Sequence, residues 1–520
     1  MKPILLMITI FVIFSFVYAS AVPSNPINFL VTGFGAVGDG RTMCTQSIQA
    51  AIDSCAQSGG GYVLVPSGRF LSGTIFLKDH VYLKLSPGAV LLGSKNLSDY
   101  TLPFLIYAEN AHDLGIIGQG TINGQGDFFW RGKQRPFHRP ERTINFENCQ
   151  DVLIRDVNIR NSAAFNIAFE DCDHVTITGV SIVNDLAAPN TDGIDPISSS
   201  NVFISNCYIE TGDDAICPKS HNVKKPLENL VVTNCVLISD DSAIKFGTAS
   251  RGVIRNCSFS NIVIRNTQYG IGFYMKDGGS FEDIQFSNIS IETVAPDSMR
   301  PDRSTNSYAI FMDIEKRNEQ SKFGVIRNII FNDMTINTAD GNCLFAGMPE
   351  QKIENVTLDN VRMRVFHRTD LSGRHKPRGT RKLKNIAVND YAHISSHFTF
   401  AYINGLNIRN LFIQDDTPDN QFERYAIWAN DVDNVVIEGF QQRQAVRNTG
   451  MSVFKLRNAR DVSIRACEPD SPNTVFLELA GGRTRDISLF GNDFTKVGAD
   501  IRLLGNIHKK VVAKVGNRRK

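Results

Sequence analysis

The chain has 520 residues, of which 42% are hydrophobic, and a formal net charge of +2. This length permits two or three ordinary domains or one long repeat structure, and the charge singles out no class of partner. No stretch beyond the first 21 residues reaches the roughly 18 uninterrupted apolar residues of a membrane helix, so we expect no membrane insertion.

The first 21 residues predict a cleavable signal peptide. Lys2 precedes an apolar run from Ile4 to Val17, which is followed by Ala19-Ser20-Ala21. A basic start, an apolar segment and small residues at the end are the features of a secretory signal. We therefore expect a mature chain from residue 22 and a secreted or periplasmic location.

The next predicted element is an amphipathic helix from Thr42 to Ala56. One face of it collects the apolar residues, which are Ile48, Ala51, Ile52 and Cys55. Three glycines at 59–61 end it. Its expected role is to cap one end of a repeat structure, because exposed strand edges recruit other chains. We place this N-terminal cap at about 28–60.

From about Asn148 the sequence repeats short runs in which apolar residues alternate with polar ones and which end in Asn. Each run is too short for an amphipathic helix and has the period of two expected of a strand with one buried face. The runs cover 152–161, 175–184, 202–206, 230–234, 253–256, 284–288 and 356–360.

Five Cys residues mark the length of the repeat. They follow Asn or Asp at intervals of 23, 35, 28 and 22 residues, and they are Cys149, Cys172, Cys207, Cys235 and Cys257. A coil of about 22 residues with three short strands, each stacked on its predecessor at roughly 4.8 Å, is a parallel β-helix. Leucine-rich repeats have a similar period but need a Leu-rich consensus that this chain lacks. We predict an all-β chain with one parallel β-helix domain over 22–520.

This fold also predicts the state of the Cys residues. Equivalent side chains stack from coil to coil, so the five are expected to form a buried ladder of free thiols. The total of ten Cys is even, and disulfide pairing in an exported chain is the alternative.

A basic segment extends from Arg362 to Lys384, with nine Lys or Arg residues and one acid. Such runs are usually solvated loops, so we expect no nucleic-acid partner.

Two segments interrupt the strand periodicity with carboxylates. One contains Asn190-Thr191-Asp192-Gly193 and the other Gly212-Asp213-Asp214-Ala215. Asp192 and Asp214 are 22 residues apart, which is one coil, so their side chains should stack about 5 Å apart on one face. Crowding of like charges raises at least one pKa, and glycoside hydrolysis needs one protonated and one ionised carboxyl group. Turn-stabilising Asp residues and a calcium site are the alternatives.

Four further segments belong to the same pattern: Gly33-Phe34-Gly35-Ala36-Val37-Gly38-Asp39-Gly40, Gly118-Gln119-Gly120-Thr121-Ile122-Asn123-Gly124, Arg139-Pro140 and Asn161-Ser162. Together with the two Asp segments, they resemble glycoside hydrolase family 28, the polygalacturonases and rhamnogalacturonan hydrolases. The resemblance covers nearly the whole mature chain. It implies a right-handed, single-stranded, pectin-lyase-like parallel β-helix whose catalytic coils lie at about 148–300. It also implies inverting hydrolysis of a galacturonic-acid-containing polysaccharide or oligosaccharide of plant type, with no cofactor or metal, by what we expect to be a monomer.

Carried over residue by residue, the resemblance makes Asp213 the general acid and makes Asp192 and Asp214 the pair that positions and deprotonates water. A separation near 5 Å between the two catalytic carboxyl groups is associated with retention of configuration in glycoside hydrolases. We expect inversion as in the family, because a water held between Asp192 and Asp214 needs no wide gap between them. Asn190 belongs to the same matching segment and is expected at the substrate.

The chain departs from the family where Gly-His-Gly and Arg-Ile-Lys motifs are expected. Ser242 or a neighbouring residue takes the place of the His, and Tyr274 takes the place of the Arg, with Lys276 retained. Arg binds a carboxylate with two hydrogen bonds, so its absence weakens the case for unsubstituted polygalacturonate. Lys245, Lys276 and Lys219 remain candidates for binding an acidic sugar as point charges, and His221 is a candidate to replace the missing His.

Two other functions fit a β-helix. A pectate-type lyase would use a calcium-bound uronate and an Arg or Lys base. A non-catalytic carbohydrate-binding β-helix is disfavoured, because it has no need for the three Asp residues.

Overall fold

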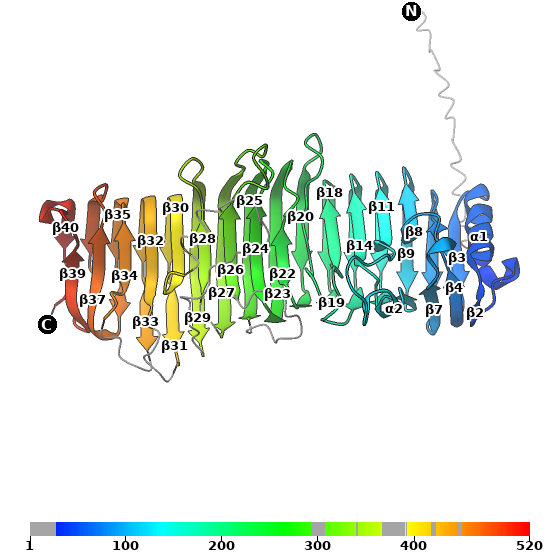
Figure 1. Cartoon of the computed structure of the whole chain (residues 1–520), viewed down its shortest axis with the longest axis horizontal. Coiled ribbons are helices and arrows are strands. Elements are labelled where there is room, and N and C mark those ends of the chain that lie inside the picture. Colours follow the sequence, from blue (N-terminus) through cyan, green and yellow to red (C-terminus); the bar gives the residue numbers. More distant parts are fainter. Residues whose placement is uncertain are drawn as a thin grey trace, which may run out of the picture.

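The computed structural model describes residues 28–293, 307–339, 342–366, 391, 393–417, 423–444 and 450–519. The predicted signal peptide and most of the basic segment at 362–384 lie outside these residues. The described chain is an elongated parallel β-helix whose coils follow one another from the N-terminal to the C-terminal end (Figure 1). Most coils contribute strands to three faces, as predicted, and the coil of Asp214 joins the third face through bridges at Ile216 and Lys219.

The first face contains the strands that follow the Asn-rich turn of each coil. They are β1 (Asn28–Leu30), β3 (Gly61–Val65), β6 (Val81–Leu85), β9 (His112–Gly118), β12 (Gln150–Arg155), β15 (Asp173–Thr178), β18 (Ser200–Ser205), β20 (Leu227–Thr233), β35 (Arg460–Arg465), β38 (Arg485–Phe490) and β40 (Val512–Val515).

The second face is built from shorter strands. They are β2 (Asp39–Met43), β4 (Gly68–Ser72), β7 (Ala89–Gly93), β10 (Thr121–Asn123), β13 (Asn158–Arg160), β16 (Ser181–Val183), β19 (Tyr208–Thr211), β21 (Val236–Ser239), β31 (Phe412–Asp415), β33 (Gln441–Gln444) and β36 (Glu468–Pro469). Between them, long strands run through both of these faces: β23 (Val253–Thr267), β25 (Ser280–Thr293), β27 (Val325–Thr338) and β29 (Ile353–Val365).

The third face carries the two Asp segments. Its strands are β5 (Ile75–Phe76), β8 (Phe104–Glu109), β11 (Arg142–Glu147), β14 (Phe165–Glu170), β17 (Ile194–Ile197), β22 (Ser242–Phe246), β24 (Tyr269–Met275), β26 (Tyr308–Ile314), β28 (Cys343–Ala346), β34 (Phe454–Arg457), β37 (Ser471–Ala480) and β39 (Val497–Leu503). Strands β30 (Ser396–Arg409) and β32 (Tyr425–Glu438) run from this face into the first.

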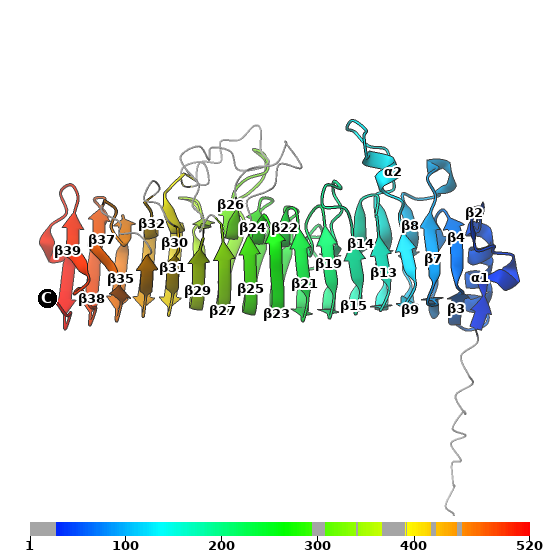
Figure 2. The same cartoon turned by 90° about the horizontal axis from the view of Figure 1, so that it is seen from below.

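Helix α1 (Thr45–Gln57) covers the N-terminal end, as predicted, and begins three residues later than expected. Its buried face contains the predicted Ile48, Ala51, Ile52 and Cys55. The short helix α2 (Asp127–Trp130) stands out from the body of the solenoid (Figure 2). The remaining helical turns are η1 (Val31–Phe34), η2 (Leu97–Asp99) and η3 (Lys509–Val511).

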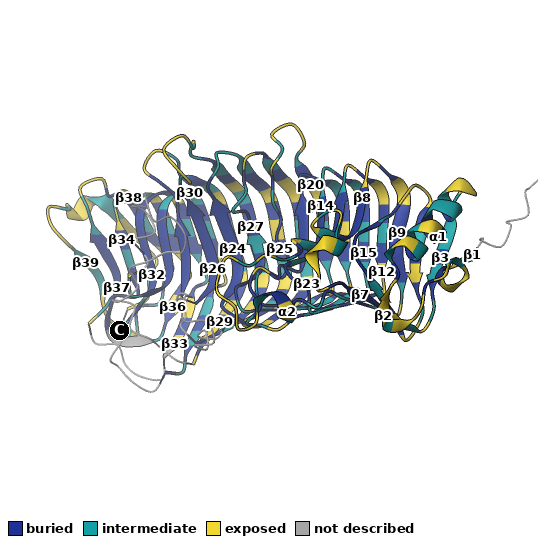
Figure 3. Cartoon of the chain, turned by 45° about the vertical axis from the view of Figure 1, so that its right-hand side comes forward, coloured by how far each residue is buried: buried dark blue, intermediate teal, exposed yellow. Residues whose placement is uncertain are grey.

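The core fills the inside of the solenoid, while the exposed residues lie mainly in the turns and loops (Figure 3). Stacked aromatic rings support the coils next to the Asp segments. Phe246 and Phe273 lie 4.5 Å apart in parallel, and Phe286 stacks between Phe259 and Phe331 at 5.1 Å from each. The hydrogen-bonded strands set a rise of about 4.8 Å from one coil to the next, and rings stacked in a buried column fit that spacing.

Asn residues end the strands because they adopt left-handed backbone conformations. Asn161, Asn206 and Asn234 have φ between 50° and 56°, a region that Asn tolerates better than most residues. Asn184 is an exception and uses its side chain instead, accepting a hydrogen bond from the Ser162 N–H at 2.8 Å. The predicted run 152–161 is two strands, β12 and β13, because Asp156 also turns the backbone, with φ of 63°.

All ten Cys residues are buried free thiols, including the five for which this state was predicted. The prediction of a single ladder of five was wrong. The strand register places Cys149 beside Cys172 and Cys207 beside Cys235, on two different faces, and Cys257 beside Leu230 in a third column. The interval of 35 residues between the second and third Cys reflects this change of face, which a count of spacings does not reveal.

No helix in the described ranges is long and apolar enough to cross a membrane.

Candidate active site

The solenoid places the two Asp segments at equivalent positions of successive coils. Ile194 pairs with Ile216, which pairs with Ile244. Residues two positions earlier therefore form one column, which contains Asp192, Asp214 and Ser242. The backbone fixes this column, since Gly193 N–H donates to Asp214 O at 2.8 Å and Ala215 N–H donates to Ser242 O at 2.9 Å.

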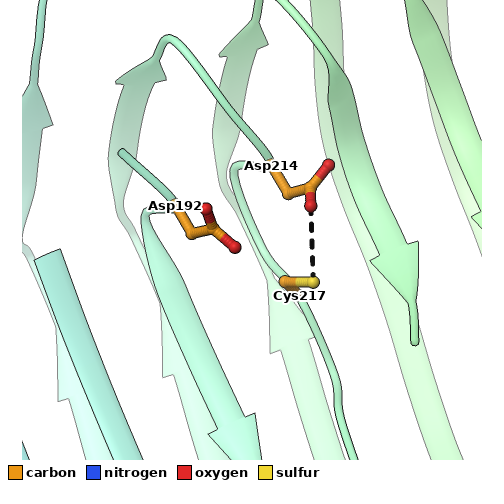
Figure 4. Close-up of side chains that lie close together, drawn as sticks. All are labelled: Asp192, Asp214 and Cys217. Carbon is orange, nitrogen blue, oxygen red and sulfur yellow. Dashed lines mark hydrogen bonds between the residues drawn. The ribbon is translucent and has the colours of Figure 1, made fainter. Parts of the chain in front are cut away.

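The carboxylates meet as the 22-residue spacing predicted. Oxygens of Asp192 and Asp214 and the Cys217 sulfur lie within 4.8 Å of one another, and so do oxygens of Asp213, Asp214 and Asp241. Figure 4 shows Asp192 and Asp214 on neighbouring coils with Cys217 beside Asp214. The Cys217 thiol donates to Asp214 Oδ2 at 3.6 Å.

Two lysines hold the buried carboxylates. Lys219 Nζ donates to Asp192 Oδ2 at 3.0 Å and also bonds Asp195 Oδ1, and Lys245 Nζ donates to Asp214 Oδ2 at 2.6 Å. Both lysines reach back by one coil, because they lie on the coils after those of Asp192 and Asp214. The predicted Lys219 and Lys245 therefore lie at the Asp cluster, where they bind protein carboxylates.

Burial sets the protonation of the cluster. Desolvation raises the pKa of Asp192 to about 8 and that of Asp214 to about 6, while the nearby ammonium groups act in the opposite direction. One ammonium group is shared between Asp192 and Asp195, which is consistent with a proton on Asp192 at neutral pH. Desolvation alone would lower the pKa of the Lys219 and Lys245 ammonium groups. The adjacent carboxylates have the larger effect and raise the pKa of both lysines above the usual range.

Asp213 is less buried than Asp214 and stands at the edge of the cluster. The hydroxyls of Thr211 and Ser239 each donate to its backbone carbonyl at 2.7 Å, and the Asp214 N–H donates to its Oδ1 at 3.1 Å. Asp213 thus has a fixed backbone and a carboxyl group that a ligand outside the solenoid is able to approach.

The residues at the departures from the family lie on the C-terminal side of the cluster. The Ser242 hydroxyl is buried and faces Asp241 Oδ1 at 3.4 Å. Lys245 Nζ lies 5.6 Å from the centre of the Tyr274 ring, and Lys276 Nζ lies 5.7 Å from it. Lys276 is buried and bonds Glu315, and its burial lowers its pKa. His221 faces Glu170, with Nδ1 at 2.9 Å from Oε1, rather than the Asp cluster.

Asn190 lies on the N-terminal side, at the rim of a cavity of about 640 Å³. Its backbone is left-handed, with φ of 54°. Its Oδ1 accepts a hydrogen bond from Arg139 Nη2 at 2.9 Å. Arg139 appeared in the sequence only as part of a framework motif.

Sequence reasoning assigned no role to Asp195, Cys217 or Asp241. The pairing of the coils would have revealed Asp195 and Cys217. Each of them follows one of the paired isoleucines by one position, as Lys245 does, so the three residues form one column. Asp241 precedes Ser242 and shares its coil. Arg139 lies in an irregular loop before β11, where no repeat fixes its position.

The cluster fits a calcium ion poorly. Calcium takes six to eight oxygen ligands, whereas the lysine ammonium groups occupy oxygens of Asp192 and Asp214 and a thiol stands beside them. Internal cations thus compensate the charge that a divalent ion would otherwise neutralise.

Comparisons with known proteins agree with this architecture. A probable polygalacturonase from Vitis vinifera is 28% identical over 376 residues, which cover 66% of this chain and 75% of the relative. An exopolygalacturonase from Thermotoga maritima has the same fold, with a TM-score of 0.57 and 20% identity over 66% of this chain and 89% of that chain. A family 28 exopolygalacturonase from Yersinia enterocolitica gives a TM-score of 0.58 at 18% identity, over 80% of this chain and 79% of that chain.

The family model of glycosyl hydrolases family 28 matches residues 55–373, which is more than half of the chain. This match spans both Asp segments, the cavity at Asn190 and the departures at Ser242 and Tyr274. The chain therefore belongs to glycosyl hydrolases family 28 and is a glycoside hydrolase.

Proposed function

We propose that this hydrolase cleaves glycosidic bonds of a galacturonic-acid-containing polysaccharide or oligosaccharide, such as polygalacturonan, pectin or rhamnogalacturonan, with inversion of configuration. The observation that carries the proposal is the cluster of Asp192, Asp213 and Asp214, in which two buried carboxylates with raised pKa values adjoin a more accessible one. The similarity to a polygalacturonase supports the substrate class.

Asp213 is proposed as the general acid that protonates the leaving oxygen, because its carboxyl group is the most accessible of the three. Asp214 is proposed as the group that accepts the proton of water. With a pKa of about 6 it is mostly ionised at neutral pH, and Lys245 holds its other oxygen. Asp192 carries a proton at that pH and positions the same water.

The short separation of the carboxylates is compatible with inversion. The rule that links about 5 Å to retention applies to an acid and a nucleophile on opposite sides of the bond. In this proposal Asp192 and Asp214 act together on one water, so their proximity to each other does not determine the outcome.

The domain organisation, the export and the oligomeric state of the protein are also proposals. A mature chain over 22–520 is expected to form one β-helix domain, to be exported and to act as a monomer. The described part of the chain supports the single domain, with coils that pack on one another from β1 to β40 and with buried thiols that need no disulfide for packing.

The decisive experiment is digestion of defined pectic oligosaccharides, with the products identified by mass spectrometry and the first-formed anomer identified by NMR. Hydrolysis products of inverted configuration that also form in the presence of a chelator are expected. Unsaturated products that require calcium would replace the proposal with a lyase. Binding without any product would replace it with a non-catalytic β-helix.

A further inference from the structure

The cavity beside Asn190 lies one coil to the N-terminal side of the Asp cluster. Ile167 pairs with Ile194, so Phe165 stands one coil before Asp192, and Arg142 stands one coil before Phe165. Both residues line the cavity, together with Tyr100, Phe137, Arg139 and Asn190. A sugar unit bound here would be continuous with one that reaches the Asp cluster.

Arg139 is held rigidly at this cavity by neutral groups. Its Nη1 donates to Ala163 O at 2.7 Å and to Pro189 O at 2.8 Å, and its Nη2 donates to Asn190 Oδ1 at 2.9 Å. A guanidinium has five N–H donors, so two remain. In the described part of the chain no acceptor contacts those two, and no carboxylate lies within ion-pairing distance of Arg139.

The opposite, C-terminal side of the cluster differs. There Lys245 bonds Asp214, Lys276 bonds Glu315, and Arg317 bonds Asp277 through two nitrogens. An aromatic ring, Tyr274, stands where the family pattern has Arg. These three cations are thus each paired with a carboxylate of the protein, whereas in the described part of the chain Arg139 forms no ion pair and is attracted by Asp213 and Asp192 only at longer range.

We propose that Arg139 binds the carboxylate of a uronate unit in this cavity. The enzyme would then recognise the acidic group of the sugar that lies toward the N-terminal end of the solenoid from the cleaved bond. This rests on the hydrolase function proposed above. A fixed guanidinium with two spare donors suits a carboxylate, which accepts paired hydrogen bonds. Phe137 and Phe165 also line the cavity, and protein cations lie over their rings, with Arg139 5.5 Å from the centre of the Phe137 ring and Lys219 Nζ 4.4 Å from that of Phe165.

The test compares hexagalacturonate with the same oligomer fully methyl-esterified, which removes the negative charge and keeps the sugar. Arg139→Gln should lower kcat/KM for the free acid about 10- to 100-fold, because paired hydrogen bonds to a charged group are among the stronger ones. For the ester it should change kcat/KM less than about threefold. Arg139→Lys should recover part of the loss. The control is Arg155→Gln, since Arg155 is exposed on β12, on another face of the solenoid, and does not line the cavity.

An equal loss on both substrates would show that Arg139 only supports the loop before Asp192, and the inference would be wrong. If the wild type cleaves neither oligomer, the substrate proposal fails separately. Titration calorimetry with hexagalacturonate then decides the inference. Binding that Arg139→Gln weakens and Arg155→Gln does not would support it, while absent or unchanged binding would overturn it.

Discussion

Lys245 donates a hydrogen bond to Asp214 at 2.6 Å from one coil further along the solenoid. This contact places a cation beside a buried carboxylate whose pKa is raised to about 6, mainly by desolvation. Without the Lys245 ammonium group, desolvation would raise the pKa of Asp214 further, and this carboxyl group would keep its proton to higher pH. Lys245 therefore sets the pH at which Asp214 is able to act as a base.

The first prediction concerns the acidic limb of the pH profile. In the wild type, kcat/KM should fall below about pH 6 as Asp214 takes up a proton. Lys245→Met should move this limb to higher pH and lower the rate at pH 6 more than at pH 8. Lys245→Arg keeps the charge and should leave the limb nearly in place. An unshifted limb in Lys245→Met would show that another group controls it.

A second prediction follows from the buried Asp192. Its pKa is raised from 3.8 to about 8 in the folded protein, so between these values the folded state binds a proton that the unfolded state has lost. This contribution to stability is full below pH 3.8 and disappears as the pH rises through 8. Asp192→Asn removes the titration. The stability of the wild type relative to Asp192→Asn should therefore decline with pH, by at most about 1.4 kcal/mol per pH unit.

Urea unfolding at pH 5, 6, 7 and 8 measures this difference. Asp486→Asn serves as the matched control, because Asp486 is exposed and already has a left-handed backbone, with φ of 55°, that Asn tolerates. The control should follow the wild type at every pH. A constant difference between the wild type and Asp192→Asn would contradict the raised pKa.

The third prediction concerns the thiols. Titration of the denatured, non-reduced protein should find most of the ten Cys residues free, whereas the native protein should react slowly because all ten are buried. Burial raises the pKa of Cys257 and of Cys343 to about 12, which further lowers their reactivity. Eight or more Cys residues in disulfides would overturn the assignment.

The sequence could predict the relative positions of residues in the regularly repeating strands of the coils. It could not predict the positions of residues in irregular loops or of long side chains that extend to the next coil. Asp192 and Asp214 are separated by one coil without an insertion, so their spacing alone brought them together. The positions of the Lys219 and Lys245 ammonium groups depend on side chains that reach back by a coil, which spacing does not encode. Arg139 comes from an irregular loop, and only three-dimensional contacts connect it to Asn190.

The last prediction tests the proposed acid. Asp213→Asn should nearly abolish hydrolysis while fold and oligosaccharide binding stay close to those of the wild type. The amide is almost isosteric with the acid and still able to accept a hydrogen bond from the Asp214 N–H, but it has no proton to give to the leaving oxygen. The loss should appear in kcat and be at least about 10²- to 10⁴-fold, the usual contribution of general acid catalysis.

The leaving group separates the roles of the three carboxylates. A substrate with an acidic phenol as leaving group needs little protonation, so it should restore turnover in Asp213→Asn, provided that the wild type accepts it. Asp192→Asn and Asp214→Asn should not be rescued, because their defect lies in positioning and deprotonating water. Circular dichroism and thermal unfolding confirm that each variant is folded. If Asp213→Asn hydrolysed the natural polymer at the wild-type rate, Asp213 would not be the acid, and the proton would have to come from another group of the cluster, with Asp192 and its raised pKa the first to test.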